Sequence, residues 1–373
     1  MKQMNIFLHV FKIILFSGIL VATASARAEL KVVTTIKPLH SLISNVMDGI
    51  GEPGLIIDGS ISPHSFTMKP SHAKMLEEAD VIFWIGEGIE TSMEEPLDSI
   101  AKDAEVIEFM ELDSIAKLKF REESIFGDHD DHDDHDDHDD HDDHDDHDDH
   151  DDHDDHDDHD DQDDHDDHDD HDDHDDHDDH DDHDDHDDHD DHDDHDDHAG
   201  HEGHNHGEFD AHIWLDPSNA KEMVHEIAHE LGDLDPANKD KYEANAEATI
   251  KALDQLISDV GTDINSDAKF VVFHDAYQYF EERFGVRAAG ALTLNTDVLP
   301  GAKQIADIQD VIKDKGIKCI FSEPQFNPKI ITTIAEDMNI KTGVFDPLGA
   351  NIDPSKSLYF KLISNLGNEL KGC

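Results

Sequence analysis

Positive charge is scarce in this sequence of 373 residues. Lysine and arginine together number 27, against 95 aspartate and glutamate residues, and the formal net charge is −68. A chain with so few cationic side chains disfavours nucleic acids and anionic lipid surfaces as partners, because like charges repel each other. The imbalance favours cations as partners.

Long apolar runs are also missing. The stretch Ile13–Ala22 is shorter than the ~20 residues that a membrane helix needs. Because early positive charge precedes it and the small-x-small sequence Ala26–Ala28 follows it, we predict a secretory signal peptide over residues 1–28. The mature chain would begin at Glu29 and lie, not inserted in a membrane, in the periplasm of a Gram-negative bacterium. Cleavage after Ala24–Ala26 is the alternative.

Cysteine occurs only twice, as Cys319 and Cys373. The two residues lack the C-x-x-C spacing of redox and metal-binding motifs. In an oxidising compartment the default interpretation is one disulfide between them. Two free thiols or a pair of metal ligands are the alternative.

Most of the acidic charge lies in an Asp-Asp-His triplet repeat over residues 128–198, interrupted once at Gln162. This tract holds 47 Asp and 23 His, and the rest of the chain carries a net charge of −21. Because the tract has no apolar residue to bury, we predict a disordered Asp- and His-rich insert over residues 120–207. Its imidazoles offer many weak metal sites, and the alternative is a solvated linker.

Short runs rich in valine and isoleucine alternate with helical spacing on both sides of the insert. We predict strands at Leu30–Ile36, Leu55–Asp58, Val81–Ile85, Glu105–Phe109, Phe270–Phe273, Val286–Leu292, Cys319–Phe321 and Thr342–Phe345. We predict helices between them at Leu39–Met47, Ala73–Glu78, Ala302–Lys313 and Pro328–Asp337. Such alternation predicts parallel sheets. The expected fold class is therefore α/β, with two parallel-sheet lobes.

A long amphipathic segment separates the two predicted lobes. Apolar residues recur every three or four positions from Tyr242 to Ile264, and Asp235-Pro236 has the character of a helix start. We predict a rigid helix over residues 236–265. It would join an N-terminal lobe of residues 29–235 to a C-terminal lobe of residues 266–373.

Three histidines stand beside predicted strand ends in both lobes. His64 follows the second strand, His212 begins the short run HIWLDP, and His274 ends the strand FVVFHD. Ligands of α/β proteins gather beyond the carboxyl ends of parallel strands, and three neutral imidazoles suit zinc with one position left open. A single histidine at a strand end is more often a hydrogen-bonding residue, so spacing alone does not establish a metal site.

The segments SPHSFTMKPS, HIWLDP, FVVFHDAYQYF, SEPQF and VFDPLG occur in this order. In these motifs the chain resembles the ZnuA-type zinc-uptake solute-binding proteins of ABC transporters, over essentially all of the mature sequence outside the insert. That family also commonly carries an acidic, histidine-rich insert ahead of the HIWLDP-like segment. The resemblance implies a non-enzymatic protein that binds Zn²⁺ as its transported ligand and delivers it to a membrane permease. We expect a monomer.

The resemblance also implies the metal ligands, which would be His64, His212 and His274. Relatives that bind manganese or iron usually have a carboxylate at the third position, so His274 favours zinc. Pro63 stands where some relatives have a glutamate next to the first histidine. The fourth ligand would then be Asp346 of VFDPLG or a water molecule.

Further roles are less specific. Glu323 would either hold an imidazole N–H near the metal or form a structural salt bridge. His40 would be a helix residue near the presumed cleft and His72 a surface residue. The family resemblance implies the Cys319–Cys373 disulfide, since zinc-binding members often pair cysteines at these places.

The segment HEIAH, residues 225–229, offers a competing interpretation. It matches the H-E-x-x-H pattern of zinc peptidases. However, it lies on a predicted helix between Asp216-Pro217 and Gly232, and an acidic, histidine-rich helix surface produces this pattern by chance. The alternative functions are a secreted zinc peptidase, a manganese- or nickel-binding transport protein, and a metal-storage protein without a transporter.

Overall fold

The computed structural model of the chain describes residues 30–125, 207–294, 296 and 300–373. The predicted signal peptide lies outside the described residues. So does the predicted insert, apart from its first six residues and Gly207.

The first of two parallel sheets is built from the sequence ahead of the insert. Its strands are β1 (Val32–Ile36), β2 (Gly54–Ile57), β3 (Val81–Trp84) and β4 (Glu105–Glu108), in the order β2-β1-β3-β4. The intervening helices are α2 (Lys37–Val46), α3 (Pro70–Glu77), α4 (Glu87–Glu90) and α5 (Glu94–Ile100), with 3-10 turns η2 (Pro63–Ser65), η3 (Thr91–Met93) and η4 (Phe109–Glu111). β1 and β3 are buried at every residue because helices cover both faces of a parallel sheet.

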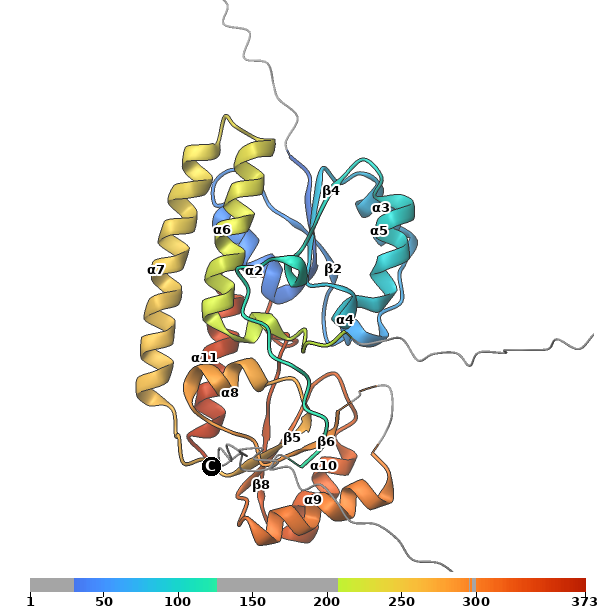
Figure 1. Ribbon diagram of the computed structural model, residues 1–373, viewed down its shortest axis with the longest axis vertical. Coiled ribbons are helices and arrows are strands. Elements are labelled where there is room, and N and C mark those ends of the chain that lie inside the picture. The colour runs from blue at the N-terminus through green and yellow to red at the C-terminus, as the bar shows by residue number, and fades with distance from the viewer. Residues whose placement is uncertain (1–29, 126–206, 295, 297–299) are drawn as a thin grey trace, which may run out of the picture. The chain divides into compact units, whose positions relative to one another are not determined.

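The second sheet repeats this arrangement after the insert (Figure 1). Its strands are β5 (Phe270–His274), β6 (Ala291–Thr293), β7 (Cys319–Ser322) and β8 (Lys341–Val344), in the order β6-β5-β7-β8. The helices between them are α8 (Gln278–Phe284), α9 (Ala302–Asp314) and α10 (Lys329–Met338). Two four-stranded parallel sheets confirm the predicted α/β fold class.

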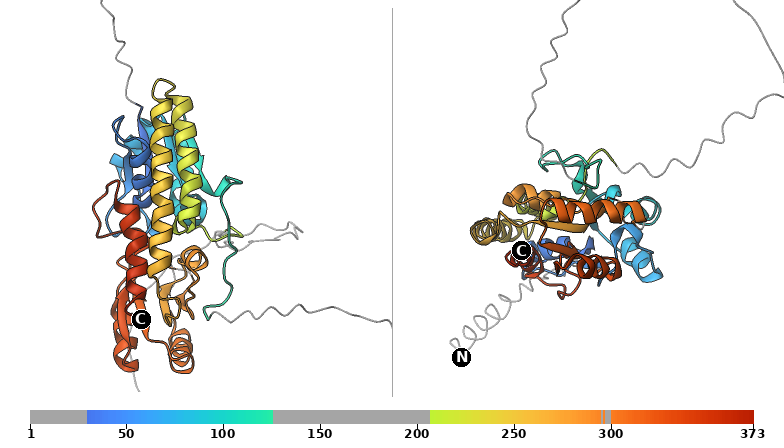
Figure 2. Two further views of the ribbon diagram at one scale, coloured as in Figure 1. Left: turned by 90° about the vertical axis from the view of Figure 1, so that its left-hand side faces the viewer. Right: turned by 90° about the horizontal axis from the view of Figure 1, so that it is seen from below.

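Three long helices connect the two sheets. The 3-10 turn η5 (Ile213–Leu215) leads into α6 (Pro217–Leu234), which lies beside the 25-residue α7 (Lys239–Asp263) in both Figure 1 and Figure 2. At 1.5 Å per residue, α7 is roughly 37 Å long. The C-terminal helix α11 (Leu358–Leu370) packs on both α7 and α2, although it follows the second sheet in sequence.

A continuous core of buried side chains joins the two sheets. It extends from the first sheet through α2, α6, α7 and α11 to one face of the second sheet, where Phe270, Phe321 and Phe345 belong to it. The other face of the second sheet has a separate core that includes Val271 and Phe273. Neighbouring residues of β5 therefore serve different cores, as the period of two in a strand requires.

Direct hydrogen bonds reinforce this connection. The buried ammonium group of Lys37 in α2 donates to the carbonyls of Gly349 and Ala350 in the loop after β8, at 2.8 and 3.1 Å. The hydroxyl of Tyr359 in α11 donates to the carbonyl of Trp214 in η5, at 2.7 Å. The C-terminal loop and helix are thus bonded to elements that precede α7.

The structure corrects several predicted boundaries. α7 begins at Lys239, because Asp235 still belongs to the end of α6, where its N–H bonds to the carbonyl of Leu231 at 2.8 Å. Gly232 does not end α6, which continues to Leu234. β6 begins at Ala291 rather than at residue 286. The exact domain boundaries stay a prediction.

The two cysteines form a disulfide, with Cα atoms 5.7 Å apart. It connects Cys319, the first residue of β7, to the last residue of the sequence, Cys373. Among the described residues, no helix combines the length and the apolar character needed to cross a membrane.

Candidate metal centre

His64, His212 and His274 come together in the structure. One possible ligand atom of each ring lies within 4.8 Å of those of the other two. The ring centroids are 5.6 Å apart for His64 and His212, 5.7 Å for His64 and His274, and 5.0 Å for His212 and His274. His212 and His274 are each 4% exposed, and His64 is partly buried. Three imidazoles at these separations can share one metal ion.

Each histidine is held by a different local structure. His64 lies in η2, where Pro63 supplies the first-turn position of a short 3-10 helix. His274 is the last residue of β5 and pairs with Thr293 of β6. His212 lies at the N-cap of η5, so the expectation that it stands beside a strand end was wrong. The run that follows His212 is apolar because it is a buried turn rather than a strand.

A buried carboxylate holds His212. Oδ1 of Asp210 lies 2.7 Å from Nδ1 of His212 and accepts the backbone N–H of the same residue at 3.0 Å. Asp210 is 2% exposed. When Nδ1 carries the proton and donates it to this carboxylate, Nε2 keeps its lone pair for a metal ion.

Glu323 holds His274 in the same manner. Its two carboxylate oxygens each lie 3.1 Å from Nδ1 of His274, and its side chain is almost fully buried. Of the two roles considered for Glu323, the structure therefore supports that of a partner for an imidazole. Buried carboxylates of this kind fix the ring orientation and increase the basicity of the metal-binding nitrogen.

The pKa values in the cluster differ because its charges differ. Burial and the neighbouring His274 lower the pKa of His212 well below its usual value, so this ring is neutral at neutral pH. Burial also lowers the pKa of His274, but the Glu323 carboxylate outweighs it and raises that pKa above its usual value. Burial raises the pKa of Asp210 to about 7. The ring of His212 is thus ready to coordinate a metal ion, whereas at the ring of His274 a proton competes with the metal ion.

Aromatic rings form part of the wall of the cluster. The ring of Trp214 lies 5.3 Å from that of His212, and its indole N–H donates to the carbonyl of Pro347 at 2.7 Å. The ring of Phe326 lies 6.1 Å from that of His274. These rings limit the access of water to the two buried histidines, which strengthens electrostatic interactions there.

Asp346 is not part of the candidate metal group, which in the described part of the chain consists of His64, His212 and His274. Its Oδ1 accepts hydrogen bonds from the side chain of Gln325 and the backbone N–H of Leu348, both at 3.2 Å. Its Oδ2 accepts the N–H of Ala350 at 2.6 Å. The carboxylate therefore stabilises its own loop, and its assignment as a fourth ligand stays a prediction.

His40 and His72 lie on helices of the first half of the molecule. His40 is in α2, where its Nδ1 lies 3.5 Å from the hydroxyl of Ser44. His72 is in α3, and its ring stacks on Phe66. Neither belongs to the cluster of three.

The HEIAH segment lies on α6, as expected. Met223, Val224, Ile227, Ala228 and Leu231 are buried, whereas His225 and His229 are exposed. The possible metal group on this surface is Glu226, His229 and Glu230, without His225. This arrangement lacks the pair of histidine ligands that the H-E-x-x-H pattern requires.

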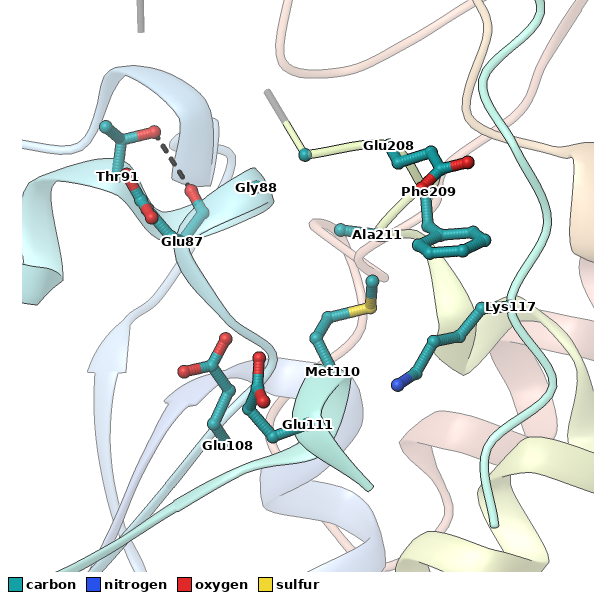
Figure 3. Close-up of a pocket in the computed structure, with 11 residues that line it drawn as sticks. Glu87, Gly88, Thr91, Glu108, Met110, Glu111, Lys117, Glu208, Phe209 and Ala211 are labelled. Atoms are coloured by element: carbon teal, nitrogen blue, oxygen red, sulfur yellow. Dashed lines mark hydrogen bonds between the residues drawn. The ribbon is translucent and has the colours of Figure 1, made fainter. Parts of the chain in front are cut away.

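A separate pocket lies next to the chain that leads to His212 (Figure 3). Its volume is about 280 Å³, and its lining includes the carboxylates of Glu87, Glu108 and Glu111 together with Met110 and Lys117. Burial and the charge of Glu111 raise the pKa of Glu108 to about 7. None of the three histidines lines this pocket.

The role of Asp210 was missed in the sequence. The D-x-H spacing of Asp210 and His212 is visible in the sequence, and an acidic side chain two positions before a histidine can contact its ring. Many surface segments share that spacing, however. What distinguishes Asp210 is its burial, which depends on contacts distant in sequence, such as the bond from the Tyr279 hydroxyl to the Asp210 carbonyl at 2.6 Å.

The family model described as zinc-uptake complex component A periplasmic, ZnuA, matches residues 32–373. The chain belongs to the ZnuA family. The high-affinity zinc uptake system protein ZnuA of Brucella abortus is 44% identical over 344 residues, covering 92% of this chain and 91% of the relative. The ZnuA protein of Paracoccus denitrificans is 34% identical, covering 97% of both chains. The predicted family is therefore confirmed.

Solved structures agree with this membership at the level of the fold. A crystal structure of ZnuA has a TM-score of 0.61 at 19% identity and covers 91% of this chain and 99% of its own. A ZnuA deletion mutant with zinc bound has a TM-score of 0.59 at 20% identity and covers 91% and 97%.

Family membership also decides between a transport component and an enzyme. ZnuA proteins are binding components of a zinc-uptake complex and catalyse no reaction. The peptidase interpretation of HEIAH is therefore rejected, both by the family and by the geometry on α6.

Proposed function

We propose that this chain captures Zn²⁺ in the periplasm with high affinity and delivers it to the membrane permease of an ABC transporter. The observation that carries the proposal is the cluster of His64, His212 and His274, whose possible ligand atoms lie within 4.8 Å of one another. Membership in the ZnuA family supports zinc as the cargo. The donor set supports it independently, because imidazole suits zinc better than it suits manganese, magnesium or calcium.

Capture is an exchange of ligands. A hydrated zinc ion gives up most of its water for three neutral imidazoles, two of which are held by buried Asp210 and Glu323. Since the rings of His212 and His274 are held before the ion arrives, these two side chains lose little freedom on binding. Binding releases any proton on the rings, so acidification weakens it.

We assign the fourth coordination position to water. Supporting this assignment, Oδ1 and Oδ2 of Asp346 accept the N–H groups of Leu348 and Ala350 in the same loop, and Oδ1 also accepts a hydrogen bond from the side chain of Gln325. Direct coordination by Asp346 is the alternative. Asp346→Asn separates the two, because it reduces zinc affinity strongly only if the carboxylate binds the ion.

The protein works, in this proposal, as a monomer that docks on the permease after secretion. The signal peptide over residues 1–28 would direct it to the periplasm. Metal released on docking would pass to the permease, while the Asp- and His-rich insert collects or buffers ions. Sedimentation of the zinc-loaded protein tests the monomer, and N-terminal sequencing of the periplasmic protein tests cleavage before Glu29.

Calorimetric zinc titration together with native mass spectrometry tests the site. The wild type is compared with a His64/His212/His274 triple alanine variant, and the matched control replaces the exposed α6 residues His225 and His229 with alanine. The triple variant is expected to lose the tight site and the control to keep it. Tight binding in the triple variant would refute the assignment.

The same titration addresses the alternative cargoes. Competition among Zn²⁺, Mn²⁺ and Ni²⁺ for the tight site is expected to favour zinc over manganese, because three nitrogen donors suit the softer ion. Growth under zinc chelation, with and without the gene, distinguishes uptake from storage. Loss of growth without the gene supports uptake.

A further inference from the structure

The chain that leads into the insert crosses from the first half of the molecule to the edge of the second sheet. This crossing segment, residues 116–125, begins where the backbone N–H and carbonyl of Ala116 bond to the side chain of Asn219 in α6, each at 3.0 Å. It ends where Ile125 forms an antiparallel bridge with Gly290, one residue before β6. Figure 1 shows this segment passing α8 on its way to β6.

The crossing segment pairs with the chain that returns from the insert. The N–H of Asp210 donates to the carbonyl of Leu118 at 2.8 Å, and the N–H of Phe120 donates to the carbonyl of Glu208 at 3.4 Å. The hydroxyl of Tyr279 in α8 accepts the N–H of Leu118 at 2.9 Å and donates to the carbonyl of Asp210 at 2.6 Å. The two ends of the insert are thereby fixed to each other and to α8.

Arg121, in the middle of the crossing segment, forms ion pairs with Glu281 of α8 and with Asp275 at the end of β5. Nη1 lies 3.0 Å from Oε2 of Glu281, and Nη2 lies 3.0 Å from Oδ1 of Asp275. The side chains are 13%, 6% and 7% exposed, respectively. Asp275 directly follows His274 in the sequence. A buried guanidinium group thus links the crossing segment to the end of β5.

Without Arg121 this region would hold several buried carboxylates close together. Asp275 and Glu281 each lie 3.0 Å from a guanidinium nitrogen of Arg121. These carboxylates and that of Asp210 raise the pKa of Arg121 above its usual value, although burial opposes them. Removing one member of such a buried ionic group leaves the remaining charges uncompensated, and the surrounding side chains move to separate or hydrate them. That movement would displace Asp275, whose carboxylate lies directly after His274 in the chain.

We propose that Arg121 is a positioning residue of the metal centre: Glu281 holds its guanidinium group in place, and the group acts on His274 through Asp275, the residue that follows it. The proposal rests on the zinc-binding function proposed above. It makes the base of the insert a structural part of the metal site, although none of its residues is a ligand.

Three variants test this role. Arg121→Met keeps the aliphatic length and removes the charge, and Arg121→Lys keeps the charge but loses the fork that spans two carboxylates. The control is Arg283→Met, since Arg283 of α8 pairs with Asp216 instead, at 2.6 and 2.8 Å. Zinc affinity is measured by chelator competition, and the geometry of the site is measured by the visible absorption bands of the Co²⁺-loaded protein.

We expect Arg121→Met to weaken zinc binding about 10–100-fold and to shift the Co²⁺ bands, as loss of groups that orient metal ligands does. Arg121→Lys should recover part of the affinity, and Arg283→Met should match the wild type. Wild-type affinity and wild-type Co²⁺ bands in a folded Arg121→Met protein would overturn the proposal.

A folding defect would not leave the question open. If circular dichroism shows that Arg121→Met is unfolded, the double variant Arg121→Met/Glu281→Gln removes one charge of each sign and is tested in its place, with the same expectation. Absence of tight zinc binding in the wild type would instead contradict the proposed function. The two failures are therefore distinguishable.

Discussion

At the scale of single residues, the metal centre depends on pairs of a ring and a carboxylate. In two such pairs a buried carboxylate lies within hydrogen-bond distance of Nδ1 of the ring. Asp210 contacts His212 in this way, and Glu323 contacts His274. The partners come from different places, Asp210 from two residues earlier and Glu323 from just after the neighbouring strand β7. Each pair fixes a tautomer that a free histidine would not hold.

Glu323→Gln is expected to weaken zinc binding about 10-fold or more, because the amide no longer supplies the charge that increases the basicity of His274. The measurement is competition with a zinc chelator at neutral pH. Glu336→Gln, an exposed change on α10, is the control and should bind zinc like the wild type. Equal affinities for the two variants would show that Glu323 has only a structural role.

Glu90 should make stability depend on pH. It is fully buried and accepts the N–H groups of Ile85 and Gly86 at 2.9 and 3.1 Å, and burial raises its pKa from 4.5 to about 7. In the unfolded chain this carboxyl group loses its proton near pH 4.5, whereas the folded protein keeps the proton to about pH 7. Stability therefore falls as the pH rises through this window.

Glu90→Gln is accordingly expected to raise the free energy of unfolding by about 1–3 kcal/mol at pH 8 and to give no advantage at pH 4. Urea unfolding at both pH values measures this difference. Glu95→Gln, an exposed change on α5, should show no such pH-dependent gain. A gain for Glu90→Gln that is the same at pH 4 and pH 8 would contradict the assignment.

At the scale of elements, short buried strands were the most predictable part of the fold. β1, β3 and β7 are runs of β-branched and apolar residues that a parallel sheet buries on both faces, so composition alone marks them. The α6–α7 junction was predicted wrongly, because Asp-Pro is as compatible with a helix end and turn as with a helix start. Choosing between these requires the backbone bonds of Asp235.

The candidate site was predictable for the three histidines and much less so for what supports them. His64, His212 and His274 lie in SPHSFTMKPS, HIWLDP and FVVFHDAYQYF, motifs that carry the resemblance to the ZnuA family. Arg121 has no such motif, and its role follows from contacts with α8 and the end of β5, more than 150 residues later in the chain. Sequence alone does not specify contacts of that range.

The disulfide that joins β7 to the C-terminus should stabilise the second half of the molecule. Its cysteines are 54 residues apart, for which the chain-entropy model gives about 4 kcal/mol as an upper figure. A Cys319→Ser/Cys373→Ser variant is expected to lose about 2–4 kcal/mol of unfolding free energy in denaturant titrations. Reduced wild-type protein is the control and should behave like the variant. If the oxidised and reduced wild type unfold alike, the bond contributes nothing.

At the scale of the whole molecule, the described body and the acidic tract are expected to have separate tasks. The body holds the histidine cluster, whereas the sequence of residues 128–198 supplies many imidazoles and no apolar residue. A tract of that composition provides many weak metal-binding positions rather than one preorganised site.

Deleting residues 128–198 is therefore expected to lower the total number of zinc ions bound and to leave one tight site. Calorimetry and native mass spectrometry measure both quantities. A variant in which every histidine of the tract is serine keeps the length and the charge, and it should resemble the deletion. Loss of the tight site on deletion would locate that site in the tract instead.

The core that α11 and α7 share has a consequence for how cargo leaves. Swinging the sheets apart would expose the aromatic side chains around Phe270 and Phe345 to water, at a cost of ~25 cal/mol for each Å² of apolar surface. Displacements confined to η2 and η5, the turns that position His64 and His212, would avoid this cost. Under the proposed function, a permease that displaced these turns on docking would shorten the lifetime of the zinc-loaded protein.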